Sequence, residues 1–292
     1  MPKRVLIQLD GDSQPSTFDA VVAVDAGAEV LLQHGGITPE NVAPLVHGAM
    51  FTRGGSDLAS TAIFVGGSDV AAAEAVATQV AATFFGPVRV GVLVDPSGAN
   101  TTAAAAVVSV GRHVDLGPAV SAVVLGGTGP VGQRVARLLA GKGVRATVAS
   151  RSLERAEAVC EQVRRRTAEA SLTPVASAGG SDPGGRFAAA IASADVIVAA
   201  GAAGVTLLDS AGRAAAVRAR VIVDLNAVPP AGIAGVAAAD KARAEGATLC
   251  YGALGVGGLK MKIHRAAIER IFSDPQAFLD AEDLLAIGES LA

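Results

Sequence analysis

Residues 120–152 of this chain are VSAVVLGGTGPVGQRVARLLAGKGVRATVASRS, and this stretch decides the fold. It begins with a short β-branched apolar run, Val120 to Leu125, and the glycines that follow form a G-x-G-x-x-G pattern. The amphipathic segment Val131 to Leu139 comes next, and a second strand-like run, Val144 to Ala149, completes the unit. The glycine pattern alone is weak evidence, but strand, glycine turn, helix and strand in this order predict a dinucleotide-binding unit.

Each glycine of the pattern has an expected role at the nucleotide. Gly127 is expected to permit a tight turn, Gly129 to let the backbone approach the pyrophosphate, and Gly132 to let the helix pack on the strand. The pyrophosphate would then lie at the helix N-terminus, where free N–H groups and the helix dipole favour an anion. The loop residues expected to contact the nucleotide are Gly127, Thr128, Gly129, Pro130, Val131 and Gly132.

The end of the second strand indicates which dinucleotide binds. An NAD site usually has an acidic residue there, which bonds the ribose 2′-hydroxyl. This chain instead has Ser150, Arg151 and Ser152 at that place, with Arg155 one turn later and no acidic residue before Glu154. A guanidinium binds phosphate oxygens in a bidentate manner, and hydroxyls add neutral hydrogen bonds. We therefore expect a 2′-phosphate site for NADP; the alternative is that Arg151 is an ordinary solvated charge.

Composition places the chain in the α/β class and limits its partners. Its 292 residues suggest about two domains, at roughly 150 residues per domain. Hydrophobic residues make up 51% of the chain and aromatic residues 3%, which suits close packing of helices on a parallel sheet. A net charge of −3 gives no reason to expect nucleic acid or an anionic membrane as a partner.

The cysteines and the apolar segments bear on the cellular compartment. Cys160 and Cys250 lie far apart without metal-binding spacing, so we expect free buried thiols, no metal site and a reducing compartment. The N-terminal apolar run is too short for a signal peptide. Asp195 interrupts the longest apolar segment, Ala188 to Leu208, and a strand with a glycine turn explains that segment better than a membrane span. We therefore expect a cytoplasmic protein.

The first block, residues 1 to about 98, alternates apolar runs with helical patterns. Thr38-Pro39-Glu40 is a typical helix start, and Ser68 is expected to cap a helix whose apolar residues recur at helical spacing. The alternation predicts a small, mostly parallel α/β domain. Its expected strands are Arg4 to Leu9, Glu29 to Gln33, Thr61 to Val65 and Val88 to Val94.

Three polar residues are candidates for contact with a substrate. Asp19 lies where a turn leads into a helix, and an ordinary role as a cap or turn carboxylate is favoured for it. Asn100 and Thr102 follow the fourth strand, at the start of a helix expected from Thr101 to His113, and are explained equally well as caps or as ligand contacts. Their location supports the second role, because ligands bind at the carboxyl ends of strands in open α/β sheets.

Two later strands are expected to end at the nicotinamide. Asp195 to Ala199 is followed by Ala200 and Gly201, whose small size would let the nicotinamide ribose lie against the backbone. Val221 to Asp224 is followed by Asn226, which either bonds the nicotinamide carboxamide or holds its own turn. The sequence leaves both roles of this asparagine open.

A glycine-rich stretch, Tyr251 to Arg265, is expected to form a turn that leads into a helix carrying Lys260, Lys262 and His264 in its first turns. Cations at a helix N-terminus oppose the macrodipole at about 0.3–1 kcal/mol each, so a ligand that favours them is expected. We favour a ligand contact for Lys260, and for Lys262 and His264 we favour side chains that point to solvent.

Three further segments have simple predictions. Leu153 to Ala170 is expected to be an exposed, charged helix, and Ser177 to Gly185 a surface loop. Ala277 to Leu291 is expected to be a closing amphipathic helix.

Several motifs together resemble one known family. They are Gln8 to Asp10, Pro15 to Asp19, Phe51 to Gly55, Thr61 to Gly67, Asn100 to Ala105, Gly126 to Gly132 and Gly252 to Lys260. Nearly from end to end, their order and spacing resemble the NADP-dependent methylene-tetrahydromethanopterin dehydrogenase of methylotrophic bacteria. This resemblance is far more specific than the glycine pattern.

The resemblance implies a fold and a reaction. It implies a Rossmann-type NADP domain at residues 99–272 and a smaller N-terminal α/β pterin-binding domain at residues 1–98, completed by the C-terminal helix 273–292, with the active site in the cleft between them. The implied reaction oxidises methylene-tetrahydromethanopterin to the methenyl cation by hydride transfer to NADP, on the path from formaldehyde to formate. A homo-oligomer is also expected, although the sequence does not locate its surface.

The resemblance carries over to individual residues. Arg151 matches the family's basic residue after the second nucleotide strand, and Arg155 stands where a family member can have lysine. Ser152 stands in place of a lysine, so the 2′-phosphate would be held with one charge fewer. Lys260 matches the lysine after the glycine-rich turn and is expected, together with Asp19, to position the pterin.

Two alternative functions stay open. A methylene-tetrahydrofolate dehydrogenase, or an enzyme that accepts both pterins, shares the reacting centre and cannot be distinguished by motifs. A non-catalytic NADPH-sensing protein would bind the nucleotide without turnover, but it leaves Lys260 and the first domain unexplained.

No catalytic acid–base pair is expected for the implied reaction, because no proton moves when hydride leaves a carbon between two nitrogens. Catalysis would come from positioning.

Overall fold

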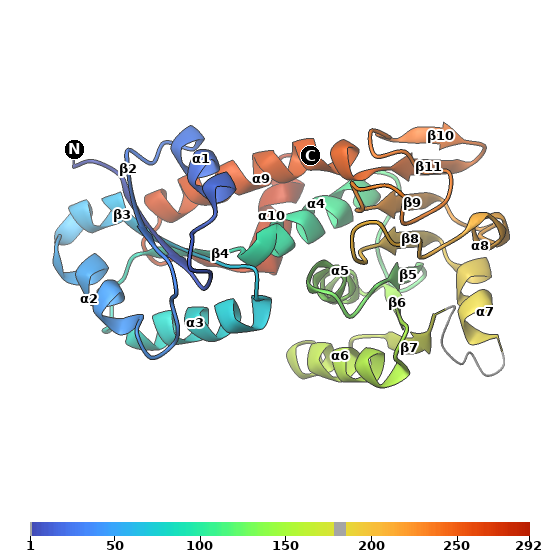
Figure 1. The fold of residues 1–292 in the computed structure, drawn as a ribbon, viewed down its shortest axis with the longest axis horizontal. Helices are drawn as coiled ribbons and strands as arrows, with labels where there is room; N and C mark the ends of the chain where they lie inside the picture. Colours follow the sequence, from blue (N-terminus) through green and yellow to red (C-terminus); the bar gives the residue numbers. More distant parts are fainter. Residues whose placement is uncertain (1, 178–184) are drawn as a thin grey trace. The chain divides into compact units, whose positions relative to one another are not determined.

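The computed structural model describes residues 2–177 and 185–292 (Figure 1). The chain divides into two compact units, residues 1–101 with 261–291 (unit 1) and residues 102–260 with Ala292 (unit 2). The divisions fall inside two helices, α4 (Ala99–Gly111) and α9 (Ala253–Ser273). The second division therefore lies earlier in the chain than residue 272, the boundary that the family resemblance implies.

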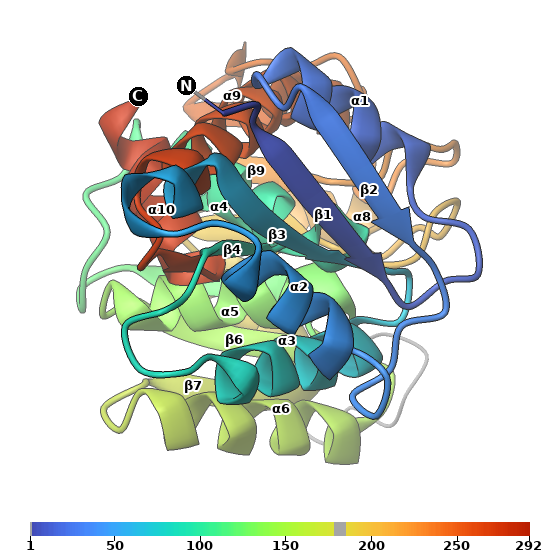
Figure 2. The same cartoon turned by 90° about the vertical axis from the view of Figure 1, so that its left-hand side faces the viewer.

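Unit 1 contains a parallel sheet in the order β12-β4-β3-β1-β2 among the described residues (Figure 2). Its strands are β1 (Val5–Asp10), β2 (Val30–His34), β3 (Thr61–Gly66), β4 (Gly91–Val94) and β12 (Phe278–Leu279). Its other elements are α1 (Thr17–Asp25), α2 (Ala43–Phe51), η1 (Gly55–Ser60), α3 (Val70–Thr83), η2 (Pro96–Gly98) and α10 (Ala281–Ser290). Strands β3 and β4 are buried throughout, as expected of parallel strands that are covered on both faces.

Alternation of side chains along these strands separates two layers. Ile63 of β3 and Val92 of β4 pack with Val46 of α2 and Val76 of α3, so α2 and α3 cover one face (Figures 1 and 2). Phe64 points to the opposite face, where it contacts the part of α9 that belongs to unit 1. Three of the predicted apolar runs, at residues 4–9, 61–65 and 88–94, thus contribute to the core of this unit, whereas the run that forms β2 is only partly buried.

Unit 2 contains a sheet in the order β10-β11-β9-β8-β5-β6-β7 among the described residues. Its strands are β5 (Ser121–Leu125), β6 (Arg145–Ser150), β7 (Leu172–Ala176), β8 (Val196–Ala199), β9 (Val221–Asp224), β10 (Arg243–Glu245) and β11 (Thr248–Tyr251), and only β10 pairs antiparallel. Its helices α5 (Pro130–Gly141) and α6 (Leu153–Arg166) lie on one side of the sheet, and α7 (Arg186–Ser193) and α8 (Ser210–Ala215) on the other (Figure 1). The α/β class and the Rossmann-type unit are therefore confirmed.

The predicted helix start at Thr38-Pro39 is wrong by about one turn, since α2 begins at Ala43. The side chain of Asn41 holds the preceding residues in a loop: its Oδ1 accepts from the Thr38 amide at 2.8 Å, and its Nδ2 donates to the Gly36 carbonyl at 3.0 Å. A side chain that bonds its own neighbours competes with the helix at this place.

The cap predicted for the next helix is also wrong. Asp69, not Ser68, caps α3, because its carboxylate accepts from the Ala72 amide at 3.0 Å. Ser68 instead donates its hydroxyl to Asp12 at 2.7 Å, a contact between residues distant in the sequence. Local patterning does not reveal such a contact.

The C-terminal segment is not one helix from Ala277. Phe278 and Leu279 form β12, which pairs with β4, and α10 begins at Ala281 behind a capping box made by Asp280 and Asp283. The charged helix α6 ends at Arg166 rather than Ala170, because Thr167 is extended. Strands β7, β10 and β11 were not predicted from the sequence. Most of the loop predicted at Ser177 to Gly185 lies outside the described residues.

Across residues 2–177 and 185–292, no helix is both long and apolar enough to cross a membrane.

Candidate functional site

The nucleotide loop lies where the strand order of unit 2 reverses, between β5 and β8. In open α/β sheets this reversal creates the crevice in which ligands bind. Gly127 lies in the tight turn, as predicted: the amide of Gly129 donates to the Gly126 carbonyl at 3.0 Å across it, and Gly126 has a φ of +67°. A Cβ on Gly126 would lie 2.7 Å from Cα of Gly201, so the loops after β5 and β8 approach each other closely.

The other glycines of the loop have packing roles. A Cβ on Gly127 would lie 2.8 Å from Cγ1 of Val148, so this glycine lets the loop pack on β6. A Cβ on Gly132 would lie 2.8 Å from Cα of Gly127, so Gly132 lets α5 pack against the turn, close to its predicted role. Gly129 is the N-cap of α5 and offers no side chain to the first amides of that helix. These amides thus meet the requirement for a pyrophosphate site at a helix N-terminus.

The end of β6 carries the predicted phosphate-binding residues. The hydroxyls of Ser150 and Thr128 lie 3.2 Å apart, which links the end of β6 to the glycine loop. Ser152 caps α6, since its hydroxyl accepts from the Arg155 amide at 3.2 Å. Arg151 and Arg155 are exposed. The two guanidinium groups and the two serine hydroxyls are the groups that a 2′-phosphate requires. Contact of Ser150, Arg151, Ser152 and Arg155 with NADP stays a prediction.

The structure shows a structural role for Asn226. Its Oδ1 accepts from the Val228 amide at 3.0 Å, and its Nδ2 donates to the Pro230 carbonyl at 2.8 Å. Asn226 therefore holds its own turn, one of the two roles left open by the sequence. Ala200 is tied to β5 by donating its amide to the Leu125 carbonyl at 2.9 Å.

Asp224, at the end of β9, was not predicted as a site residue. It is almost completely buried and accepts from the amides of Asn226 at 3.0 Å and Ile233 at 2.9 Å. Burial raises the pKa of its carboxyl, and the backbone hydrogen bonds act against that rise. Asp224 thus organises the loop that follows β9. An acidic residue directly after an apolar strand was the available signal.

Unit 1 has its own reversal of strand order, between β1 and β3. Asp10 is fully buried there and accepts from the amides of Asp12 at 2.9 Å and Ser16 at 3.1 Å. The Asp12 carboxylate in turn accepts from the Ser68 amide at 3.0 Å, so the loops after β1 and β3 are joined. Asp19 lies on the first turn of α1 directly after this loop and is mostly buried.

Asn100 is held in the scaffold of unit 1. It is fully buried, and its Nδ2 donates to the Val94 carbonyl at 2.6 Å and to the Asp280 carboxylate at 3.0 Å. This asparagine joins the end of β4 to the cap of α10, which is a structural role. Thr102, the first residue of unit 2, is partly buried in α4. Direct contact of either residue with a substrate stays a prediction.

The predicted glycine turn before Lys260 is in fact the start of α9, which runs from Ala253. Lys260 therefore lies in the third turn, where the macrodipole has little effect, and the dipole argument for a ligand does not apply. Lys260 is partly buried and Lys262 is exposed. His264 was expected in solvent, but it is fully buried in unit 1 because α9 packs on the sheet there.

No cluster of three or more metal-binding side chains occurs in the described ranges, 2–177 and 185–292. Cys160 and Cys250 are free and buried, as predicted.

A cavity of about 390 Å³ lies in unit 1 beneath α2, with Leu32, Leu45 and Arg53 among its lining residues.

Two family models match different parts of the chain. A family model described as methylene-tetrahydromethanopterin dehydrogenase, N-terminal, matches residues 17–97. A model described as shikimate / quinate 5-dehydrogenase matches residues 115–244. Quinate dehydrogenase from Corynebacterium glutamicum in complex with NAD has a similar fold, with a TM-score of 0.53 and 16% identity over 99% of this chain and 100% of that chain.

Two relatives come from Methylorubrum extorquens AM1. Bifunctional protein MdtA is 42% identical over 295 residues, and the NAD(P)-dependent methylenetetrahydromethanopterin dehydrogenase is 33% identical over 302 residues. Both matches cover 100% of this chain and 100% of the relative. The chain therefore belongs to the methylene-tetrahydromethanopterin dehydrogenase family.

Proposed function

We propose that this protein is an oxidoreductase that oxidises methylene-tetrahydromethanopterin to methenyl-tetrahydromethanopterin and reduces NADP. The observation that carries the proposal is the match at 33% identity, over 100% of both chains, to an NAD(P)-dependent methylenetetrahydromethanopterin dehydrogenase. The nucleotide loop supports it independently, because the uncapped start of α5, the close glycine turn and the basic end of β6 suit NADP.

The residues of this chain would act by binding and positioning. The first amides of α5 would hold the pyrophosphate, and Arg151 and Arg155 would hold the 2′-phosphate. Lys260 and Asp19 would position the pterin. NADP, when bound, would supply the acceptor for the hydride.

The chemistry itself makes small demands on the protein. The methylene carbon lies between two nitrogens, whose lone pairs stabilise the cation that remains after hydride departs. The chain therefore needs to bring the reacting carbons within about 3–3.5 Å and to exclude water, and it needs no acid–base pair.

Oligomerisation is also proposed. Three exposed apolar side chains recur at every third position of α1: Phe18, Val21 and Val24. Their spacing supports the expectation of a homo-oligomer, which molar mass from light scattering tests.

The reaction is tested by initial rates with methylene-tetrahydromethanopterin and methylene-tetrahydrofolate, each with NADP and NAD. Fast turnover with the methanopterin and NADP is the expected result. A preference for the folate would make the protein a methylene-tetrahydrofolate dehydrogenase. Tight NADPH binding without turnover in any of the four mixtures would instead favour a nucleotide sensor.

A further inference from the structure

The first turns of α9 have a low intrinsic helix propensity. Gly255, Gly257 and Gly258 lie within its first two turns. A glycine inside a helix costs about 0.5–1 kcal/mol relative to alanine. The conformation of this segment therefore depends on contacts with the rest of unit 2.

The turn formed by residues 237–241, here called the docking turn, provides those contacts. The amide of Gly252 donates to the Asp240 carbonyl at 2.8 Å, and the amide of Leu254 donates to the Ala238 carbonyl at 2.8 Å. The amides at a helix start have no partner within the helix, so the docking turn acts as the cap of α9.

The glycines of α9 show which side of the helix meets the docking turn. A Cβ on Gly252 would lie 2.6 Å from the carbonyl carbon of Ala238, and one on Gly255 would press on the backbone of Asp240. A Cβ on Gly257 or Gly258 would meet no described atom within 4 Å. Close approach of the docking turn therefore requires glycine at 252 and 255 only.

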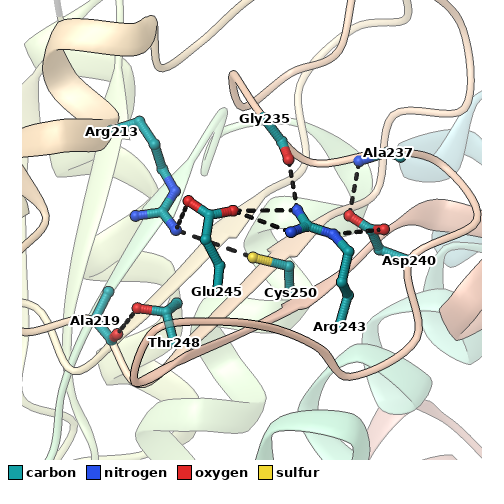
Figure 3. Close-up of polar contacts among 9 residues, drawn as sticks. All are labelled: Arg213, Ala219, Gly235, Ala237, Asp240, Arg243, Glu245, Thr248 and Cys250. Carbon is teal, nitrogen blue, oxygen red and sulfur yellow. Dashed lines mark hydrogen bonds and ion pairs between the residues drawn. The ribbon is translucent and has the colours of Figure 1, made fainter.

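An ion-pair network holds the docking turn in shape (Figure 3). Asp240 is largely buried; its Oδ2 accepts from the Ala237 amide at 2.9 Å, and its Oδ1 lies 2.8 Å from Nε of Arg243. Nη2 of Arg243 also donates to the Gly235 carbonyl at 2.6 Å and to Glu245 at 3.2 Å. One guanidinium thus links Asp240 of the docking turn to the Gly235 carbonyl, just before that turn, and to Glu245 of β10.

We propose that Asp240 and Arg243 are positioning residues, which fix the docking turn and through it the start of α9 and the place of Lys260. The inference rests on the proposed function, in which Lys260 positions the pterin. Lys260 lies about 10 Å along the helix axis from Ala253, at 1.5 Å per residue, so a shift of the helix start is transmitted to it. A displacement of about 1 Å is enough to slow a reaction by up to 100-fold.

The test compares Arg243→Gln, Asp240→Asn and the control Arg165→Gln, which removes an exposed ion pair with Glu161 on α6. For Arg243→Gln and Asp240→Asn we expect kcat to fall about tenfold, with the KM for NADP within about twofold of wild type. Arg243→Lys keeps one donor for Asp240 and is expected to restore part of kcat. The control is expected to match wild type.

A double-mutant cycle with Lys260→Ala tests whether the effect passes through Lys260. Arg243→Gln is expected to have little further effect on kcat when Lys260 is already alanine, because the two changes remove the same interaction. Additive losses, or an unchanged kcat in Arg243→Gln, would overturn the inference.

Hydrogen exchange separates this inference from the proposed function. The amides of Gly252 and Leu254 are expected to exchange at least fivefold faster in Arg243→Gln than in wild type, whichever substrate the enzyme uses. Unchanged exchange overturns the inference even in an active enzyme. If wild type does not turn over the methanopterin, the proposed function fails, and the exchange rates still decide whether the network holds α9.

Discussion

The imidazole of His264 lies stacked on the phenyl ring of Phe64, with ring centroids 5.8 Å apart and planes inclined by 20°. Both side chains are almost completely buried in unit 1. This pair joins helix α9 to the central strand β3. It also reverses the expectation that His264 points to solvent.

We expect His264→Ala to lower the free energy of unfolding by about 2–4 kcal/mol, because it leaves a cavity over Phe64. Denaturant unfolding measures this change. Lys262→Ala, on the exposed side of the same helix, is the control and is expected to change stability by less than about 0.5 kcal/mol. Equal stability of the two variants would contradict the packing role of His264.

Gly126→Ala is expected to weaken NADP binding and to destabilise unit 2. Position 126 has a φ of +67°, and an added Cβ would lie 2.7 Å from Cα of Gly201. The matched control is Gly141→Ala, at the end of α5, where no described atom lies within 4 Å of the added Cβ. Calorimetry with NADP and thermal unfolding should show losses in the first variant only.

The paired substitution Arg151→Gln and Arg155→Gln is expected to raise the Kd for NADP by about tenfold or more, the value of a hydrogen bond to a charged group. The Kd for NAD should stay within about twofold, because NAD has no 2′-phosphate. Arg165→Gln, another exposed arginine of α6, controls for loss of positive charge. An equal loss of affinity for both dinucleotides would remove these arginines from the phosphate site.

The contribution of Asp195 to stability is expected to depend on pH. Burial raises the pKa of this carboxyl, but hydrogen bonds from Ser121 and the charges of Arg218 and Arg220 outweigh it, so the pKa lies below its ordinary value. The ionised form is therefore stabilised in the folded state. That stability is present above the unfolded pKa of about 3.9 and is lost as pH falls through the folded pKa.

Asp195→Asn tests this dependence by urea unfolding at several pH values. The variant is expected to be less stable than wild type at pH 7, and the difference should shrink as the solution becomes more acidic. A difference that is constant with pH would show that ionisation of Asp195 does not matter.

The sequence by itself determined the class of the fold and the place of the nucleotide loop. Continuous apolar runs such as Val221 to Val223 and Ala122 to Leu125 became buried parallel strands, because burial on both faces favours apolar residues at successive positions. Local chemistry also located the basic end of β6, where serine and arginine follow the strand directly.

Only the tertiary structure decided which residues are used for packing and which for capping. Ser68 donates a hydrogen bond to Asp12, and Asn100 donates to Val94 and to Asp280. His264 stacks on Phe64. Each partner is distant in the sequence or lies on another element. The glycine-rich stretch before Lys260 is helical, and carbonyl groups of the docking turn, outside the helix, accept the hydrogen bonds of its first amides. Propensity and spacing describe a segment and its nearest neighbours, whereas such contacts arise only when strands and helices from distant parts of the chain pack together.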